Sequence, residues 1–123
     1  MIYKLAISDI VTFQVRLSVN DAGVKKDFSF WFDARRQESR RLKEELEEHG
    51  EMKVMDFHAK VCRDNLTDWR DQRLVVGEDG QGVAFAPEAL ELVLGLPGAA
   101  TLIHHAYMEA IVASESKAGR AKN

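Results

Sequence analysis

The chain has little cysteine, no long apolar run and almost no excess charge, and each shortage excludes a class of protein. Its 123 residues include a single cysteine, Cys62, which excludes a disulfide framework and a zinc site built from several cysteines. No apolar run is long enough to span a bilayer. With 17 basic and 20 acidic side chains the formal charge is −3, so the whole chain has no electrostatic reason to bind nucleic acid or an anionic membrane.

What is present has the composition of one globular domain. A chain of this length suits a single domain that buries about two thirds of its unfolded surface, so it needs no crosslink to fold. We find no internal repeat and no low-complexity linker, and we predict one domain over residues 1–116. The small and basic residues 117–123 are predicted to form a flexible tail. Residues 1–4 lack the basic start of a secretory signal, so we expect a soluble cytoplasmic protein.

Two segments in the first third of the chain alternate between apolar and polar residues, which is the period of a half-buried strand. Residues 20–23 between them are turn formers that tolerate positive φ. The pattern predicts an antiparallel β-hairpin with one apolar face, which must be covered because an isolated hairpin is marginal in water. The apolar positions are Phe13, Val15, Leu17, Val19, Phe28, Phe30 and Phe32.

Trp31 breaks this alternation. It falls on the face opposite Phe30 and Phe32, where the other residues are mostly polar. Either a helix crosses that face and covers the indole, or Trp31 is an interface anchor, since partly exposed tryptophans are enriched at binding hot spots. The sequence leaves both interpretations open.

Residues 34–48 are mostly helix formers and are densely charged, so we predict a helix there. Only Leu42 and Leu46 are apolar between residues 35 and 48, at i and i+4, which predicts a thin buried stripe. The charges are sorted against the helix dipole, with arginines in the first half and glutamates in the second. These residues are Arg35, Arg36, Arg40, Arg41, Glu44, Glu45, Glu47 and Glu48.

This charge order has more than one interpretation. The helix could be solvated and hold internal ion pairs, such as Arg40 with Glu44 and Arg41 with Glu45. Alternatively, its basic end could meet the acidic end of a neighbouring copy. A third interpretation, in which the arginines contact nucleic-acid phosphates, is opposed by the glutamates of the same segment and by a pI of about 5.8.

The rest of the chain is predicted to be mainly helical. Gly50 suits the end of the first helix, and Pro87 suits the first residue of a later one. The overall prediction is an α+β fold in which an N-terminal antiparallel β-hairpin packs on about four helices. The further predicted elements are a helix over 54–69, a tight turn or short second hairpin between 74–76 and 83–85, a short helix from residue 87 broken at residues 95–98, and a helix over 99–114.

The histidines are the only candidates for chemistry. His58 and Cys62 lie four residues apart and could face one metal ion, but two ligands do not make a site and the edge of a core is the favoured interpretation. His104 and His105 are adjacent, about 100° apart on a helix, so they cannot easily share a metal, and we expect one of them to face solvent. We find no nucleophile elbow, no paired-histidine metalloprotease motif and no phosphate-binding loop. We therefore predict a protein that is not an enzyme, with no catalytic, metal-binding or cofactor-binding residues.

Several short stretches, taken in order, carry a resemblance to a known family. They are residues 9–13, 28–36, 64–69, 83–90, the pair Pro97-Gly98 and residues 106–110. None is specific alone, but their order and spacing over most of the chain resemble the tail assembly chaperones of long-tailed, lambda-like bacteriophages. One departure is Ala86, because similar proteins often have Ser or Thr there to cap a helix.

The resemblance implies a role without catalysis. Such chaperones multimerise into spirals or rings in the host bacterial cytoplasm. They bind the tape measure protein and keep it soluble until the tail tube polymerises around it, and they are absent from the mature virion. In many such phages a programmed frameshift gives a longer second version, and residues 122 and 123 suit a slippery codon pair. The implied partners are the chain itself, the tape measure protein, the longer version and the major tail protein, with no membrane and no nucleic acid.

These observations together predict a self-association surface. We expect Trp31 and the sorted charges to form it, with the arginines of one copy facing the glutamates of the next. Heterologous contacts that do not close on themselves produce spirals. The alternative from another class is a small prophage-encoded regulatory module that binds nucleic acid through the helix at residues 35–41.

Overall fold

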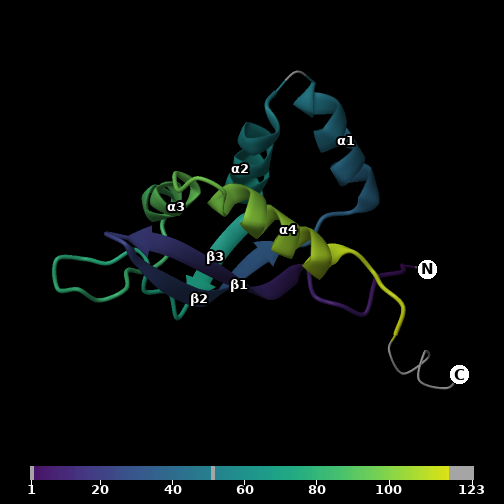
Figure 1. Ribbon diagram of the computed structural model, residues 1–123. Helices are drawn as coiled ribbons and strands as arrows, with labels where there is room; N and C mark the ends of the chain where they lie inside the picture. Colours follow the sequence, from purple (N-terminus) through teal and green to yellow (C-terminus); the bar gives the residue numbers. More distant parts are fainter. Residues whose placement is uncertain (1, 51, 117–123) are drawn as a thin grey trace, which may run out of the picture.

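In a computed structural model, which describes residues 2–50 and 52–116, the chain folds as an antiparallel sheet with helices on one of its faces (Figure 1). The sheet has three strands in the order β1-β2-β3. The predicted α+β fold, with an N-terminal hairpin and four helices among the described residues, is confirmed. The elements are β1 (Ile10–Asp21), β2 (Val24–Arg35), α1 (Ser39–His49), α2 (Val54–Asn65), β3 (Leu66–Arg70), α3 (Pro87–Leu94) and α4 (Ala99–Ile111).

The hairpin is set by a two-residue turn. Ala22 and Gly23 have φ values of 53° and 89°, which is the positive-φ pair that a tight hairpin turn requires. Every residue from Ile10 to Asp21 then has a partner on β2, and Phe13 lies opposite Phe32. The side chains that alternate along both strands therefore fall on the two faces that the sequence predicts.

The apolar face of the hairpin forms the floor of the core. Phe32 is fully buried and Phe30 is 1% exposed. Ile103 and Tyr107 of α4 are also buried, and the rings of Phe13 and Tyr107 lie 6.0 Å apart. Burial of each such side chain stabilises the fold by roughly 1.5–3 kcal/mol, so this layer holds the helices to the sheet.

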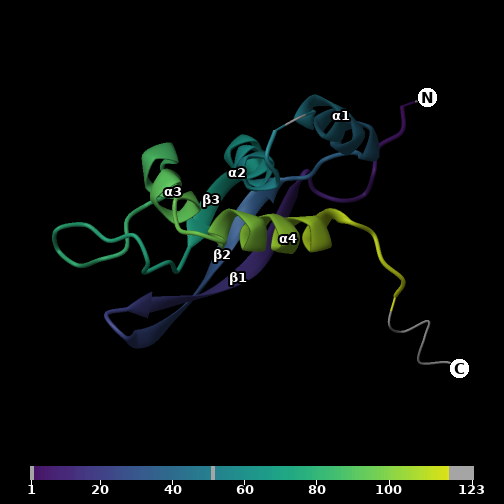
Figure 2. The ribbon, with the colours of Figure 1, turned by 45° about the horizontal axis from the view of Figure 1, so that its top comes forward.

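The helices leave the opposite face of the sheet open. In Figure 2, α4 runs across β1, and α2 lies on the other side of α4. Both views place the helices on the same side of the sheet. The outward side chains of β1 are exposed, and they are Thr12, Gln14, Arg16 and Ser18.

The predicted helix over residues 34–48 begins later than expected. Ala34 and Arg35 belong to β2, opposite Val11 and Ile10, and α1 begins at Ser39. The apolar alternation of β2 continues to Ala34, which is fully buried, and this burial outweighs local helix propensity. Gly50 follows the last residue of α1 with a φ of 50°, as predicted.

The predicted helix over residues 54–69 is also divided. α2 ends at Asn65, whose side-chain amide donates to the Val61 carbonyl, and the chain continues as the third strand. On β3, Trp69 lies opposite Phe32, and their rings are 6.2 Å apart. The helical spacing of Trp69 with the α2 residues was misleading, because a strand places the same indole over the phenylalanines.

The predicted second hairpin is reduced to one bridge, between Val76 and Gly82. The buried Gln72 holds this loop, because its amide nitrogen donates to the carbonyls of Val75 and Val83. A Cβ at residue 82 would lie 2.2 Å from the Gln72 carbonyl oxygen, so only glycine fits.

The helices after this loop agree better with the sequence. Pro87 begins α3, and the Leu90 amide bonds to the Ala86 carbonyl in the absence of a side-chain cap. α4 ends at Ile111 rather than at residue 114, and its Leu102 side chain is 43% exposed. The predicted flexible tail, residues 117–123, lies outside the described residues.

The hairpin turn gives a test of this fold. Ala22 adopts a left-handed conformation that costs an alanine roughly 1 kcal/mol. We expect Ala22→Asn to raise the free energy of unfolding by up to about 1 kcal/mol, and Ala22→Val to lower it, in urea titrations followed by circular dichroism. Equal stability of the two variants would contradict the turn geometry.

Candidate interaction surface

Trp31 lies on the open face of the sheet. It is 39% exposed, opposite Gln14 on β1 and Arg70 on β3. A hollow of about 320 Å³ beside it is lined by Thr12, Trp31, Arg70 and Asp71. The interpretation in which a helix covers the indole is wrong, because the described helices lie on the other face.

Fixed polar groups surround Trp31. The carboxylate of Asp33 accepts a hydrogen bond from the Thr12 hydroxyl at 2.7 Å and one from the Arg70 guanidinium, also at 2.7 Å. Gln14 donates to the Ser29 hydroxyl at 2.9 Å. A half-exposed indole framed by ordered polar side chains has the layout of a binding hot spot, in which a polar rim excludes water from a central aromatic residue.

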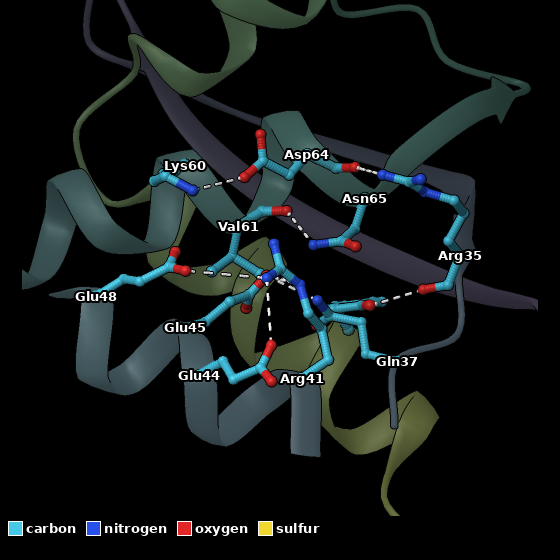
Figure 3. A network of polar contacts seen from close by, with 11 residues as sticks. Arg35, Gln37, Arg41, Glu44, Glu45, Glu48, Lys60, Val61, Asp64 and Asn65 are labelled. Carbon is cyan, nitrogen blue, oxygen red and sulfur yellow. Dashed lines mark hydrogen bonds and ion pairs between the residues drawn. The ribbon is translucent and has the colours of Figure 1, made fainter. Parts of the chain in front are cut away.

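The sorted charges meet in a cleft where β2, α1 and the end of α2 come together (Figure 3). The cleft has a volume of about 350 Å³. Six of the nine predicted surface residues line it, whereas Trp31, Glu47 and Glu48 do not. The six are Arg35, Arg36, Arg40, Arg41, Glu44 and Glu45.

Arg41 is the centre of the charges on α1. Its guanidinium lies 3.7 Å from Glu44, 3.9 Å from Glu45 and 4.0 Å from Glu48. The predicted pair of Arg41 with Glu45 is confirmed, but no ion pair joins Arg40 to Glu44 in the part of the chain that the structure describes. The pairs of Arg41 with Glu44 and Glu48 are half-exposed, and such pairs contribute roughly 0–1 kcal/mol each, so these two stabilise α1 only weakly.

Glu45 is buried, which corrects the predicted stripe of α1. It is 4% exposed, whereas Leu46 is 63% exposed. The amide nitrogen of Gln37 donates to the Glu45 carboxylate at 2.7 Å. Because Glu45 is enclosed within its own chain, it cannot face an arginine of a neighbouring copy as the sequence suggested.

Arg35 and Arg36 tie segments of the chain together. The Arg35 guanidinium donates to the Asp64 carbonyl, and the Arg35 carbonyl accepts the Tyr107 hydroxyl at 2.7 Å. Burial raises the pKa of Tyr107 and the Glu45 charge adds to this, so the phenol remains a donor. Arg36 donates to the Ser8 carbonyl at 3.0 Å. Both guanidinium groups are therefore engaged within the chain, which weakens the interpretation of a phosphate-binding helix.

A cluster that the sequence did not predict gathers His49, His58, His104 and His105 from α1, α2 and α4. The rings of His58 and His104 are stacked, with centroids 4.2 Å apart, and the His49 ring lies 4.4 Å from Phe57. Sequence reasoning treated these histidines separately because their spacing along the chain gives no sign that three helices converge. His105 is exposed, as expected of one of the adjacent pair.

Two of these four histidines, His58 and His104, have a lowered pKa that favours the neutral ring. Burial, together with the neighbouring His58 and His105, lowers the pKa of His104 to about 4. Burial lowers the pKa of His58, and His105 and His49 add to this effect. The Nδ1 atom of His58 lies 2.9 Å from the Thr101 hydroxyl. Cys62 is buried in the core, which raises its pKa to about 12 and makes the thiol unreactive. Among residues 2–50 and 52–116, no group of three or more histidine, cysteine or acidic side chains is arranged to hold a metal.

Removal of the buried carboxylate tests the α1 contact. In Glu45→Ala, Gln37 loses its partner while partly buried, so we expect the free energy of unfolding to fall by about 1–3 kcal/mol. The exposed Glu47→Ala on the same helix is the matched control and should change it by less than about 0.5 kcal/mol. Equal effects in chemical denaturation would contradict the buried position of Glu45.

The histidine cluster predicts a pH dependence of stability. The folded-state pKa of His104 lies below its usual 6.5, so the stability is present above pH 6.5 and is lost as the pH falls toward 4. We expect His104→Phe to flatten the thermal-melting profile between these pH values, and His105→Phe to have a smaller effect because His105 adds less to the lowered pKa of His104 than burial does. The same slope in wild type and His104→Phe would show that another group titrates.

Comparisons of this chain with protein-family models, with curated proteins and with solved structures found no match. Among the described residues no single helix is long and apolar enough to cross a membrane. The pair α3 and α4 would be long and apolar enough together, but the two helices are bent by 109° at the break between them.

Proposed function

We propose that this protein is a tail assembly chaperone of a long-tailed bacteriophage or prophage. In this proposal it self-associates in the host cytoplasm and keeps the tape measure protein soluble until the tail tube forms around it. The role is not catalytic and ends before the virion is complete. The observation that carries the proposal is the open face of the sheet with the half-exposed Trp31 at its centre.

The fold supports this proposal by where it places the stretches of resemblance. Residues 28–36 and 64–69 are distant in the sequence, but they form most of β2 and β3, which are paired in the sheet. Residues 9–13 lead into β1 on the other side of β2. Three of the six stretches that suggested the family therefore come together as one sheet, and the outer surface of that sheet is the one that carries Trp31.

The contact between copies, as we propose it, depends on Trp31 more than on the sorted charges. Arg41 is satisfied within its own helix, and Glu45 is buried. Exposed charges such as Arg40 and Glu47 remain available for a neighbouring copy, but ion pairs at an exposed rim contribute little affinity. A half-exposed indole contributes far more when it is covered.

The first test is self-association. In gel filtration with light scattering, we expect Trp31→Ser to raise the dissociation constant between copies at least about tenfold. Leu92→Ser is the matched control, because Leu92 is a 66% exposed apolar residue on α3, away from the open face. Loss of assembly in both variants, or in neither, would contradict a contact through Trp31.

The second test concerns binding to the tape measure protein. The proposal predicts that a long, helix-rich tape measure protein is encoded downstream of this chain. When the chain is co-expressed with fragments of that protein, a fragment that is insoluble alone should co-purify with it. Failure of every fragment to co-purify would contradict the chaperone role. Binding to duplex DNA with a steep dependence on salt would favour the regulatory alternative.

A further inference from the structure

The segment Ile2–Ser8, which precedes β1, exposes apolar side chains that the fold does not use. Ile2 is 97% exposed, Tyr3 83%, Leu5 75% and Ile7 55%. Tyr3, Leu5 and Ile7 occupy alternate positions, and Lys4, Ala6 and Ser8 occupy the positions between them. This is the alternation of a strand with one apolar face, although the segment pairs with no strand of the described chain.

β1 is an edge strand of twelve residues, and its outer edge has no partner strand in the described chain. In a hairpin closed by a two-residue turn, Asp21 and Val24 exchange backbone hydrogen bonds, and bonded pairs then alternate along the strands. The backbone amides of the intervening residues point away from β2. They belong to Ile10, Thr12, Gln14, Arg16, Ser18 and Asn20.

The hydrogen bond of the Ile10 amide agrees with the expectation that this amide points away from β2. The Ile10 amide donates to the Ser8 hydroxyl, outside the ladder. No backbone hydrogen bond joins the outer amides of β1 to another segment among residues 2–50 and 52–116. A long edge with free amides is a template for a further strand, and proteins generally cover or interrupt such edges.

α4 provides an apolar border along this edge. Thr101 and His104 contact His58, so they mark the flank of α4 that faces α2. By helical geometry, Leu102, Ala106 and Ala110 form a row on the opposite flank. Leu102 is 43% exposed, and both alanines are partly buried. A strand added beside β1 would therefore find apolar side chains on its core side.

The base of the Ile2–Ser8 segment is fixed, while its apolar side chains are not covered. The Arg36 backbone amide donates to the Asp9 carbonyl at 2.6 Å, and the Arg36 guanidinium donates to the Ser8 carbonyl at 3.0 Å. These bonds tie the base to the end of β2. As an extended strand, seven residues span about 23 Å, which fits within the roughly 40 Å of β1.

We propose that the segment Ile2–Ser8 of one copy adds as a strand to the outer edge of β1 in a second copy, with Tyr3, Leu5 and Ile7 directed beneath α4. Each copy then donates one segment and offers one edge. The contact is heterologous, so it propagates from copy to copy rather than closing as a simple pair. The inference rests on the self-association in the proposed function, but it adds a contact separate from the open face that carries Trp31.

The edge and the segment are tested by separate variants. Arg16→Pro removes an outward amide without removing a bond to β2, and Arg16→Thr changes the same side chain but keeps the amide. The triple variant Tyr3→Ser, Leu5→Ser, Ile7→Ser removes the apolar face of the segment, and Lys4→Ser with Ala6→Ser is its control. Each variant is made in a Trp31→Ser background, which weakens the separate contact through the open face. There we expect Arg16→Pro and the triple variant to be monomeric by sedimentation velocity, whereas both controls assemble as the Trp31→Ser protein does.

Mixing gives the decisive result. Arg16→Pro keeps an intact segment, and the triple variant keeps an intact edge, so an equimolar mixture should form a one-to-one heterodimer that grows no further. In the Trp31→Ser background, a mixture that stays monomeric, or a triple variant that assembles as the Trp31→Ser protein does, would overturn the proposal. Assembly that persists without the segment while Trp31→Ser abolishes it would leave the proposed function standing and only this inference refuted.

Amide hydrogen exchange keeps the test valid if Arg16→Pro fails to fold. In the wild type, the amides of Thr12, Gln14, Arg16 and Ser18 should exchange slowly at high protein concentration and rapidly at low concentration. Protection that does not depend on concentration would mean that the segment folds back on its own β1. Rapid exchange in the assembled protein would show that the edge is free, and either result would overturn the proposal.

Discussion

The structure depends on the cover that the helices give to one face of the hairpin. The phenylalanines of β1 and β2 cannot remain in water, and the Ile103 and Tyr107 side chains of α4 close over them. Successive side chains on a strand point to opposite faces of the sheet. Burial of the phenylalanines on one face therefore places Trp31 and its polar neighbours on the other face, toward solvent. The arrangement of the helices follows from the first face, and the candidate interaction surface follows from the second.

Alternation made the hairpin predictable, whereas the positions at which the helices end were not. A strand pattern records burial directly, so Phe13, Phe30 and Phe32 indicate their own face. The charged segment gave a strong helix signal from residue 34, but Ala34 is needed in the core opposite Val11. Likewise Trp69 has the spacing of the α2 helix face, and only its position opposite Phe32 shows that it belongs to a strand. In both cases a tertiary contact decides between two local structures that the sequence permits.

The charges of residues 35–48 illustrate the same limit at the candidate surface. Their order along the chain suggested two ends of opposite sign, but the helix turns Glu45 inward to Gln37 and Leu46 outward. Arg35 and Arg36 lie before the helix and fix the Asp64 carbonyl and the Ser8 carbonyl. The sorted charges thus act mainly within one chain, and the features directed outward are the indole of Trp31, the edge of β1 and the apolar segment before it. The histidine cluster needed three helices to converge, which no local pattern reports.

An open sheet face, a free edge and an unpaired apolar segment in one small chain are the features on which we base the proposal that its working form contains several copies. The most direct measurement is the weight-average mass of the wild-type protein by sedimentation equilibrium over a wide range of concentration. The account predicts that the mass rises through successive multiples of the 13.9 kDa chain without stopping at two copies. A mass that stays at 13.9 kDa, or that reaches a constant value at the dimer, would contradict it.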